Sequence, residues 1–147
     1  IQVMLAGYVA ERITTGTSGT GVGGGQGSDF HNAMRTAQAM VRSFGMGQSG
    51  LIGDFSAVED AQLSEKTKQT LDEDAQLILQ TCLKKTTEIL TEHKNVLEYF
   101  AQELLEKGDL EYNDVQDIFN KFGLKPATQK SLQEEEDLRN KPDSLES

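Results

Sequence analysis

An aspartate at the start of a predicted helix is the residue of this sequence best placed to do chemistry. Asp29 precedes an i, i+3, i+4, i+7 apolar pattern, which predicts a helix over residues 29–44 with one buried face. On such a helix Asp29 projects near Ala33 and Met40, at the head of the buried face. A carboxylate directed inward needs a cation or a hydrogen-bond donor. Asp29 is therefore either an acid favoured by the helix N-terminus or a metal-binding or catalytic group. The apolar pattern consists of Phe30, Ala33, Met34, Ala37, Met40, Val41 and Phe44.

Three other side chains are of types that bind metals or act as nucleophiles: His31, His93 and Cys82. His31 lies two residues beyond Asp29, about 200° around a helix, so the two cannot easily hold one ion and a surface position is predicted for His31. His93 falls at the predicted end of a helix, where a cation or a solvated side chain is typical. Cys82 lies on an apolar helical stripe without a base near it in sequence, and we expect it to pack in the core.

A glycine-rich stretch over residues 16–27 leads directly to Asp29. Because glycine loses more backbone entropy on ordering than other residues, a mobile loop is predicted. A Gly-x-Gly pattern before a helix can bind phosphate, but here no strand of branched residues precedes it and no Lys-Ser or Lys-Thr follows it. The loop is therefore not expected to bind a nucleotide, and it would border the site to which Asp29 belongs.

A first helix is predicted over residues 2–14, with Val3, Gly7 and Ala10 on one side. Two of these three residues are small, so another helix could approach this side closely. The sequence thus predicts a helix that needs a partner on that side.

Three further helices are predicted after residue 63. Ser64 is a suitable N-cap for a long helix to about residue 93, and shorter helices follow over residues 96–107 and 113–122. We expect these three helices to form a bundle around one apolar centre. The side chains expected to be buried in them are Leu71, Ala75, Ile78, Leu79, Cys82, Ile89, Leu90, Leu97, Phe100, Ala101, Leu104, Leu105, Val115, Ile118, Phe119 and Phe122.

Length and charge restrict the class of protein. The 147 residues allow one domain with a modest core. The net charge of −10 is uneven, because residues 1–58 are balanced whereas residues 59–124 carry seven basic and fifteen acidic side chains. An acidic helical half argues against binding to nucleic acid or to anionic lipid. No apolar run approaches the roughly 20 residues needed to cross a bilayer, so any membrane anchor would lie outside this chain.

Three stretches of the sequence resemble the peptidase domain of the FtsH family, the membrane-anchored ATP-dependent zinc metalloproteases. Residues 5–13 (LAGYVAERI) are similar to the family helix LGGRxAEExxFG, and residues 14–16 with 28–30 (TTG and SDF) resemble TTGASxDFxxAT. Residues 39–46 (AMVRSFGM) resemble AxxMVxxFGM, and residues 103–107 (ELLEK) fall where the family has ALLEKE. The chain is therefore identified as similar to the C-terminal part of that domain.

The resemblance implies a fold and a site. The fold would be mainly α, a helical metallopeptidase-domain fragment over residues 1–124 that ends in a C-terminal helical bundle, followed by a disordered polar tail over residues 125–147. Asp29 takes the position of the third zinc ligand, and the two histidines and the general base of an HExxH helix would lie upstream. That helix would be the missing partner of the first helix. Glu11 would then lie near the metal and orient one of its ligands, unless it is an ordinary surface glutamate.

The resemblance also implies the setting of the intact protein. It would bind zinc and, through an upstream ATPase domain, ATP. It would act on protein substrates as a homo- or hetero-hexamer, and segments outside this chain would hold it in a bacterial inner membrane, facing the cytoplasm, or in a mitochondrial or plastid membrane. The chain itself has neither HExxH nor a phosphate-binding GxxxxGK[ST] loop, so we expect it to be inactive alone.

Two alternatives remain open at this point. The family passes from TTG to Ser-Asp with only one or two residues between them, whereas here residues 17–27 intervene. This insertion fits a proteolytically inactive homologue that serves as a structural or regulatory subunit. A free-standing acidic helical adaptor would explain the composition but not the similarity over residues 5–53.

Overall fold

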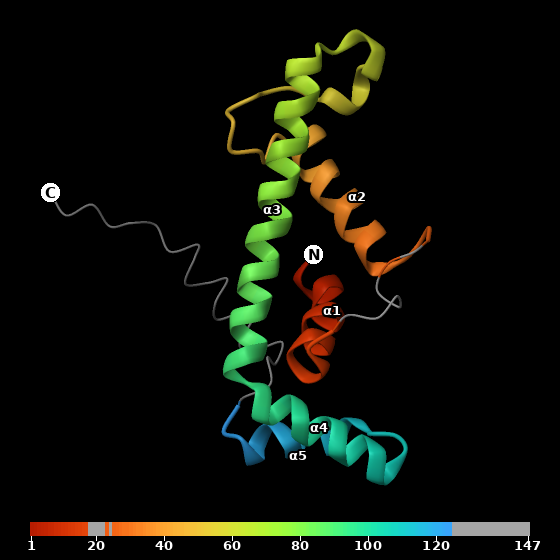
Figure 1. The fold of residues 1–147 in the computed structure, drawn as a ribbon, viewed down its shortest axis with the longest axis vertical. Helices are drawn as coiled ribbons and strands as arrows, with labels where there is room; N and C mark the ends of the chain where they lie inside the picture. Colours follow the sequence, from red (N-terminus) through yellow and green to blue (C-terminus); the bar gives the residue numbers. More distant parts are fainter. Residues whose placement is uncertain (18–22, 24, 125–147) are drawn as a thin grey trace, which may run out of the picture. The chain divides into compact units, whose positions relative to one another are not determined.

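The computed structural model describes residues 1–17, 23 and 25–124, and the regular structure of these residues is helical, without a strand. The mainly α prediction is therefore confirmed. Half of the glycine-rich stretch, residues 18–22 and 24, and the predicted tail over residues 125–147 lie outside the described residues. The helices are α1 (Gln2–Thr15), α2 (Asp29–Arg42), α3 (Glu65–Glu92), α4 (Lys94–Lys107) and α5 (Tyr112–Lys121), with the 3₁₀ turns η2 (Phe55–Ala57) and η3 (Asp60–Gln62) before α3 (Figure 1).

The contacts divide the chain into two compact units, Ile1–Lys94 and the part from Asn95 onward. In the first unit α1 and α2 both pack along α3 and against each other. Figure 1 shows α2 beside the first half of α3 and α1 beside its second half. The prediction grouped α3 with the two helices after it, whereas in the structure α3 forms one compact unit with α1 and α2. None of the helices among the described residues is both long and apolar enough to span a membrane.

The core of the first unit lies where α2 crosses α3. Ala37 and Val41 of α2 meet Leu71 and Ala75 of α3, and all four are almost fully buried. Small side chains allow the two helices to approach closely, and burial of the apolar side stabilises helices that would be marginal alone. The predicted cap of α3 is confirmed, because the Ser64 hydroxyl accepts the backbone N–H of Thr67 at 3.1 Å.

The end of α2 differs from the prediction. The helix stops at Arg42 instead of residue 44, since Gly45 turns the chain with a φ of +63° and the Met46 N–H reaches the Met40 carbonyl at 2.9 Å. Phe44 consequently lies beyond the helix and is 71% exposed, although it was predicted to be buried.

The second unit joins α4 and α5 through aromatic pairs. Tyr99 packs edge-on against Phe122 and Phe100 against Phe119, with ring centroids 5.6 Å apart in both pairs. Leu105 was predicted to be buried but is 86% exposed, because it lies about 200° around α4 from the side that faces α5. The other predicted core residues that the structure places at the surface are Ala101 and Leu104 of α4 and Ile89 of α3.

A polar network also ties α4 to α5. Lys107 lies 2.7 Å from Asp114 and 3.2 Å from Glu103, while the Tyr99 hydroxyl donates to Glu103 at 2.5 Å. The hydrogen bond from Tyr99, then that from Lys107, lowers the pKa of Glu103. The hydrogen bond from Lys107, then the backbone N–H of Glu111, lowers the pKa of Asp114. The two carboxylates in turn raise the pKa of Lys107.

The substitution Lys107→Met is expected to lower the melting temperature slightly at neutral pH and to have almost no effect in acid. Because the folded-state pKa values of Glu103 and Asp114 lie below their unfolded values, the network stabilises the fold above about pH 4 and loses this contribution as the pH falls through the folded values. Thermal unfolding followed by circular dichroism at about pH 7 and about pH 3 measures the difference. Lys85→Met, at an exposed lysine of α3, is the matched control. If Lys107→Met lowers the melting temperature equally at both pH values, the ion pairs of Lys107 with Glu103 and Asp114 do not stabilise the fold.

Candidate functional site

Asp29 is the first residue of α2, and the backbone around it is held by two side-chain hydrogen bonds. The Ser28 hydroxyl accepts the His31 N–H at 3.3 Å, and the Asn32 side-chain amide donates to the Gly27 carbonyl at 3.1 Å. The prediction that Asp29 heads the buried side is wrong for the described residues, because its side chain is exposed and burial on α2 begins one turn later, at Ala33. Asp29 is thus an exposed carboxylate in the first turn of a helix that Ser28 caps.

The other predicted site residue, Glu11, lies near the end of α1 and is half-buried. Its backbone carbonyl accepts hydrogen bonds from the hydroxyls of Thr14 and Thr15 at 3.1 and 2.8 Å. No group of three His, Cys, Asp or Glu side chains that could hold a metal lies together in the described part of the chain. The orienting role of Glu11 therefore stays a prediction, as does the ligand role of Asp29.

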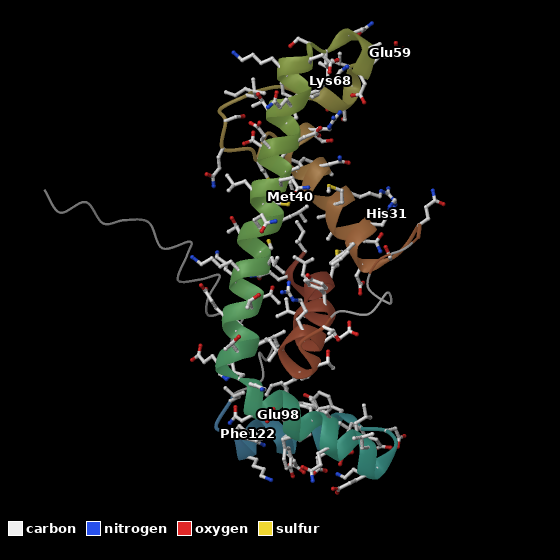
Figure 2. The ribbon with its side chains drawn as sticks, viewed as in Figure 1. His31, Met40, Glu59, Lys68, Glu98 and Phe122 are labelled. Carbon is white, nitrogen blue, oxygen red and sulfur yellow. The ribbon has the colours of Figure 1, made fainter. Side chains whose placement is uncertain are left out.

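The two histidines and the cysteine lie on or directly after helices α2 and α3. His31 is half-buried, and Figure 2 shows it on α2 at the side turned away from α3. His93 follows α3 directly, where its N–H caps the Ile89 carbonyl at 3.0 Å, and this confirms the predicted helix end. Cys82 is half-buried on α3.

An apolar cavity of about 330 Å³ adjoins the start of α2. It lies among α1, α2 and α3, and the edge-on pair of Tyr8 and Phe30, with centroids 5.0 Å apart, forms part of its wall. Arg12 supports Tyr8, since its guanidinium donates to the Tyr8 hydroxyl at 2.9 Å. Phe30 was predicted to be buried, but it remains partly exposed beside this cavity. The remaining lining residues are Leu5, Ala33, Met34, Gln76, Leu79, Gln80 and Leu83.

The side of α1 that carries Val3 and Gly7 is open among the described residues. Val3 is 89% exposed, and a Cβ placed on Gly7 would meet no atom within 4 Å, whereas Leu5 and Val9 are buried on the opposite side. This arrangement is consistent with the predicted approach of another helix to α1 at this side.

A buried carboxylate on α3 was not predicted from the sequence. Asp74 lies on the buried side of α3 between Leu71 and Ala75, and its carboxylate accepts hydrogen bonds from Gln48 and Ser49 of the loop after α2. The available signal was an acid inside the i, i+3, i+4 apolar pattern of α3, which is costly unless donors meet it.

The chain matches the model of peptidase family M41 over residues 1–118. Among similar proteins, the mitochondrial inner membrane m-AAA protease component yta12 of Schizosaccharomyces pombe is 34% identical over 92% of this chain and 17% of its own length. The ATP-dependent zinc metalloprotease FtsH of Borreliella burgdorferi is 30% identical over 80% of this chain and 20% of its own. The mitochondrial inner membrane m-AAA protease component AFG3L1 of Mus musculus is 30% identical over 90% of this chain and 17% of its own. The chain therefore spans about a fifth, or less, of the length of these relatives.

Proposed function

The chain belongs to peptidase family M41, and from this premise we propose that it is part of an ATP-dependent zinc endopeptidase that degrades membrane and soluble proteins. Its own contribution is Asp29, which would supply the third protein ligand of the zinc. The observation that carries the proposal is the exposed Asp29 carboxylate at the capped start of α2, within the segment that matches the family.

The donor set of the chain fits one position of a catalytic zinc site. Such sites take three protein ligands and leave a fourth position for water, whose pKa the zinc lowers toward neutrality. Asp29 offers one carboxylate, and the only histidines of the sequence are His31, two residues further along α2, and His93, directly after α3. The two histidine ligands and the general base would therefore come from an HExxH helix outside this sequence.

The open side of α1 is the proposed seat for that HExxH helix. Gly7 would let its backbone approach closely, and Val3 would lose its exposure on contact. A helix seated there would pass near Glu11 at the end of α1. Glu11 would then orient one of the zinc ligands without binding the zinc itself.

The remaining parts of the proposal concern the intact protein. An ATPase domain in another segment would bind ATP and deliver unfolded protein substrates, and six like or related subunits would form the working assembly. Segments outside this chain would anchor the intact protein in a bacterial inner membrane or in a mitochondrial or plastid membrane. The names of the relatives, which include mitochondrial inner membrane components and bacterial FtsH proteins, support this setting.

A second candidate function is that of a proteolytically inactive homologue with a structural or regulatory role. The observation that favours it is the glycine-rich insertion that ends directly before Ser28 and Asp29. In that case the helices would be retained for subunit contacts, and Asp29 would act only as a helix-start acid.

Casein cleavage by the intact protein and by the 147-residue chain tests the proposal. With ATP and zinc the intact protein is expected to degrade casein, and a zinc chelator is expected to stop it, because the nucleophilic water depends on the metal. The isolated chain is expected to be inert. Cleavage by the isolated chain would overturn the proposal, whereas inactivity of the intact, zinc-supplemented protein would favour the inactive homologue.

A further inference from the structure

The carboxylate of Asp74 binds the loop that follows α2. Asp74 is only 6% exposed, and its Oδ1 accepts the backbone N–H groups of Gln48 and Ser49, both at 3.0 Å. Its Oδ2 accepts the Ser49 hydroxyl at 2.5 Å. Hydrogen bonds to a charged, buried acceptor are among the stronger ones in proteins, and losing the acceptor leaves its donors unsatisfied.

The loop passes so close to this carboxylate that a side chain does not fit. A Cβ built on Gly47 would lie 2.2 Å from Asp74 Oδ2 and 2.7 Å from its Cγ, well inside contact distance. Gly47 is therefore required beside Asp74, because a side chain at this position would displace the carboxylate that accepts hydrogen bonds from Gln48 and Ser49.

A second tie holds the same end of α2. Arg42, in the last turn of α2, donates to Asp60 at 2.8 Å and lies 3.8 Å from Asp72 of α3. The Arg42 hydrogen bond and charge lower the pKa of Asp60. Both partners of Arg42 are largely exposed, however, so this tie is weaker than the buried one at Asp74.

The contact between α2 and α3 combines small side chains with larger ones. Ala37 of α2 and Ala75 of α3 form shallow ridges beside the larger Val41 and Leu71. Directional hydrogen bonds at the C-terminal end of α2 can fix the position of this helix along α3 more specifically than apolar packing alone. Since a helix is stiff, a shift at Arg42 is carried to Asp29, roughly 20 Å away at 1.5 Å per residue.

We propose that Asp74 is a positioning residue, which fixes α2 along α3 through the loop at Gly47–Ser49 and thereby places Asp29 at the other end of the helix. The inference rests on the proposed function of Asp29 as a zinc ligand. Asp74 itself would touch neither metal nor substrate.

Zinc affinity of the intact protein, measured by competition with a chelator, tests this inference. Asp74→Asn removes the charge and one acceptor, and it is expected to weaken zinc binding about tenfold, the lower end of the range for groups that hydrogen-bond a metal ligand directly, because Asp74 acts through α2. At saturating zinc the kcat for casein should return to near that of the wild type, because the ligands themselves are intact. A variant that is merely unfolded would not recover with zinc. Hydrogen exchange at Gln48 and Ser49 should be faster in the same variant.

Matched variants separate the outcomes. Glu73→Gln, at the exposed neighbour on α3, should leave zinc affinity unchanged. Ser49→Ala removes one of the three donors and keeps the carboxylate, so it should weaken zinc binding in the same direction even if Asp74→Asn fails to fold. Faster exchange in the loop with unchanged zinc affinity would overturn the inference. If Asp29→Ala leaves zinc affinity unchanged, the proposed function of Asp29 has failed. If Asp29→Ala loses zinc but Asp74→Asn and Ser49→Ala do not, only the inference about Asp74 has failed.

Discussion

Replacing Asp29 with alanine is expected to lower the kcat/KM of the intact protein for casein by roughly 100-fold or more, because a zinc ligand is lost at the reacting centre. The fold should survive, since Asp29 is exposed and the helix cap is made by Ser28. Loss of the acid from the first turn of α2 costs only about 0.3–1 kcal/mol in helix stability. Casein cleavage with ATP measures the activity, and circular dichroism measures the helix content.

Asp109→Ala is the control for this substitution, because Asp109 is an exposed acid in the turn between α4 and α5. It should leave both activity and helix content unchanged. If Asp29→Ala retains the activity of the wild type, Asp29 has no role in the reaction, and another residue must complete the metal site.

Replacing Leu71 with alanine is expected to reduce the free energy of unfolding by about 2–5 kcal/mol, the range for large-to-small changes in a packed core. Leu71 is 2% exposed and joins Ala37 and Val41 across the contact between α2 and α3. Because the partners are small and helical, they cannot easily collapse into the space that the leucine leaves. Urea unfolding followed by circular dichroism measures the change.

Leu77→Ala provides the comparison on the same helix. Leu77 is 44% exposed, so its truncation should cost less than about 1 kcal/mol. Equal losses at Leu71 and Leu77 would show that the contact between α2 and α3 is not the core of the first unit.

Local features of this fold could be predicted from the sequence, whereas the pairing of helices could not. Ser64 marks the start of α3 because its hydroxyl caps a backbone N–H three residues on, which is a local interaction. Apolar spacing likewise places Ala37 and Leu71 on buried sides. The same spacing does not identify the covering element, and so the packing of α1 and α2 on α3 was not predicted and Leu105 was predicted to be buried.

Asp74 shows why a buried polar residue is difficult to predict. Its donors, Gln48 and Ser49, lie 26 and 25 residues earlier in the chain, in a loop without a periodic pattern. Helical spacing places this acid among the apolar positions of α3, unlike its exposed neighbours Asp72 and Glu73, but only the three-dimensional contact shows which donors meet it.

The exposure of Asp29 differs from the prediction, and its role as a zinc ligand stays a prediction. The resemblance identifies Asp29 as a candidate ligand, and helical spacing places it on the apolar side of α2. The prediction of burial assumed that this side is covered along the full length of the helix. In the structure the cover on α2 begins at Ala33, which leaves the first turn accessible.

Zinc content per subunit, measured by elemental mass spectrometry on the intact protein beside its Asp29→Ala variant, tests the central claim most directly. The metallopeptidase account predicts about one zinc per subunit in the wild type and clearly less in the variant. Equal zinc in the two proteins would contradict the role of Asp29 as a ligand. The absence of zinc from both would contradict the metallopeptidase account and support an inactive homologue.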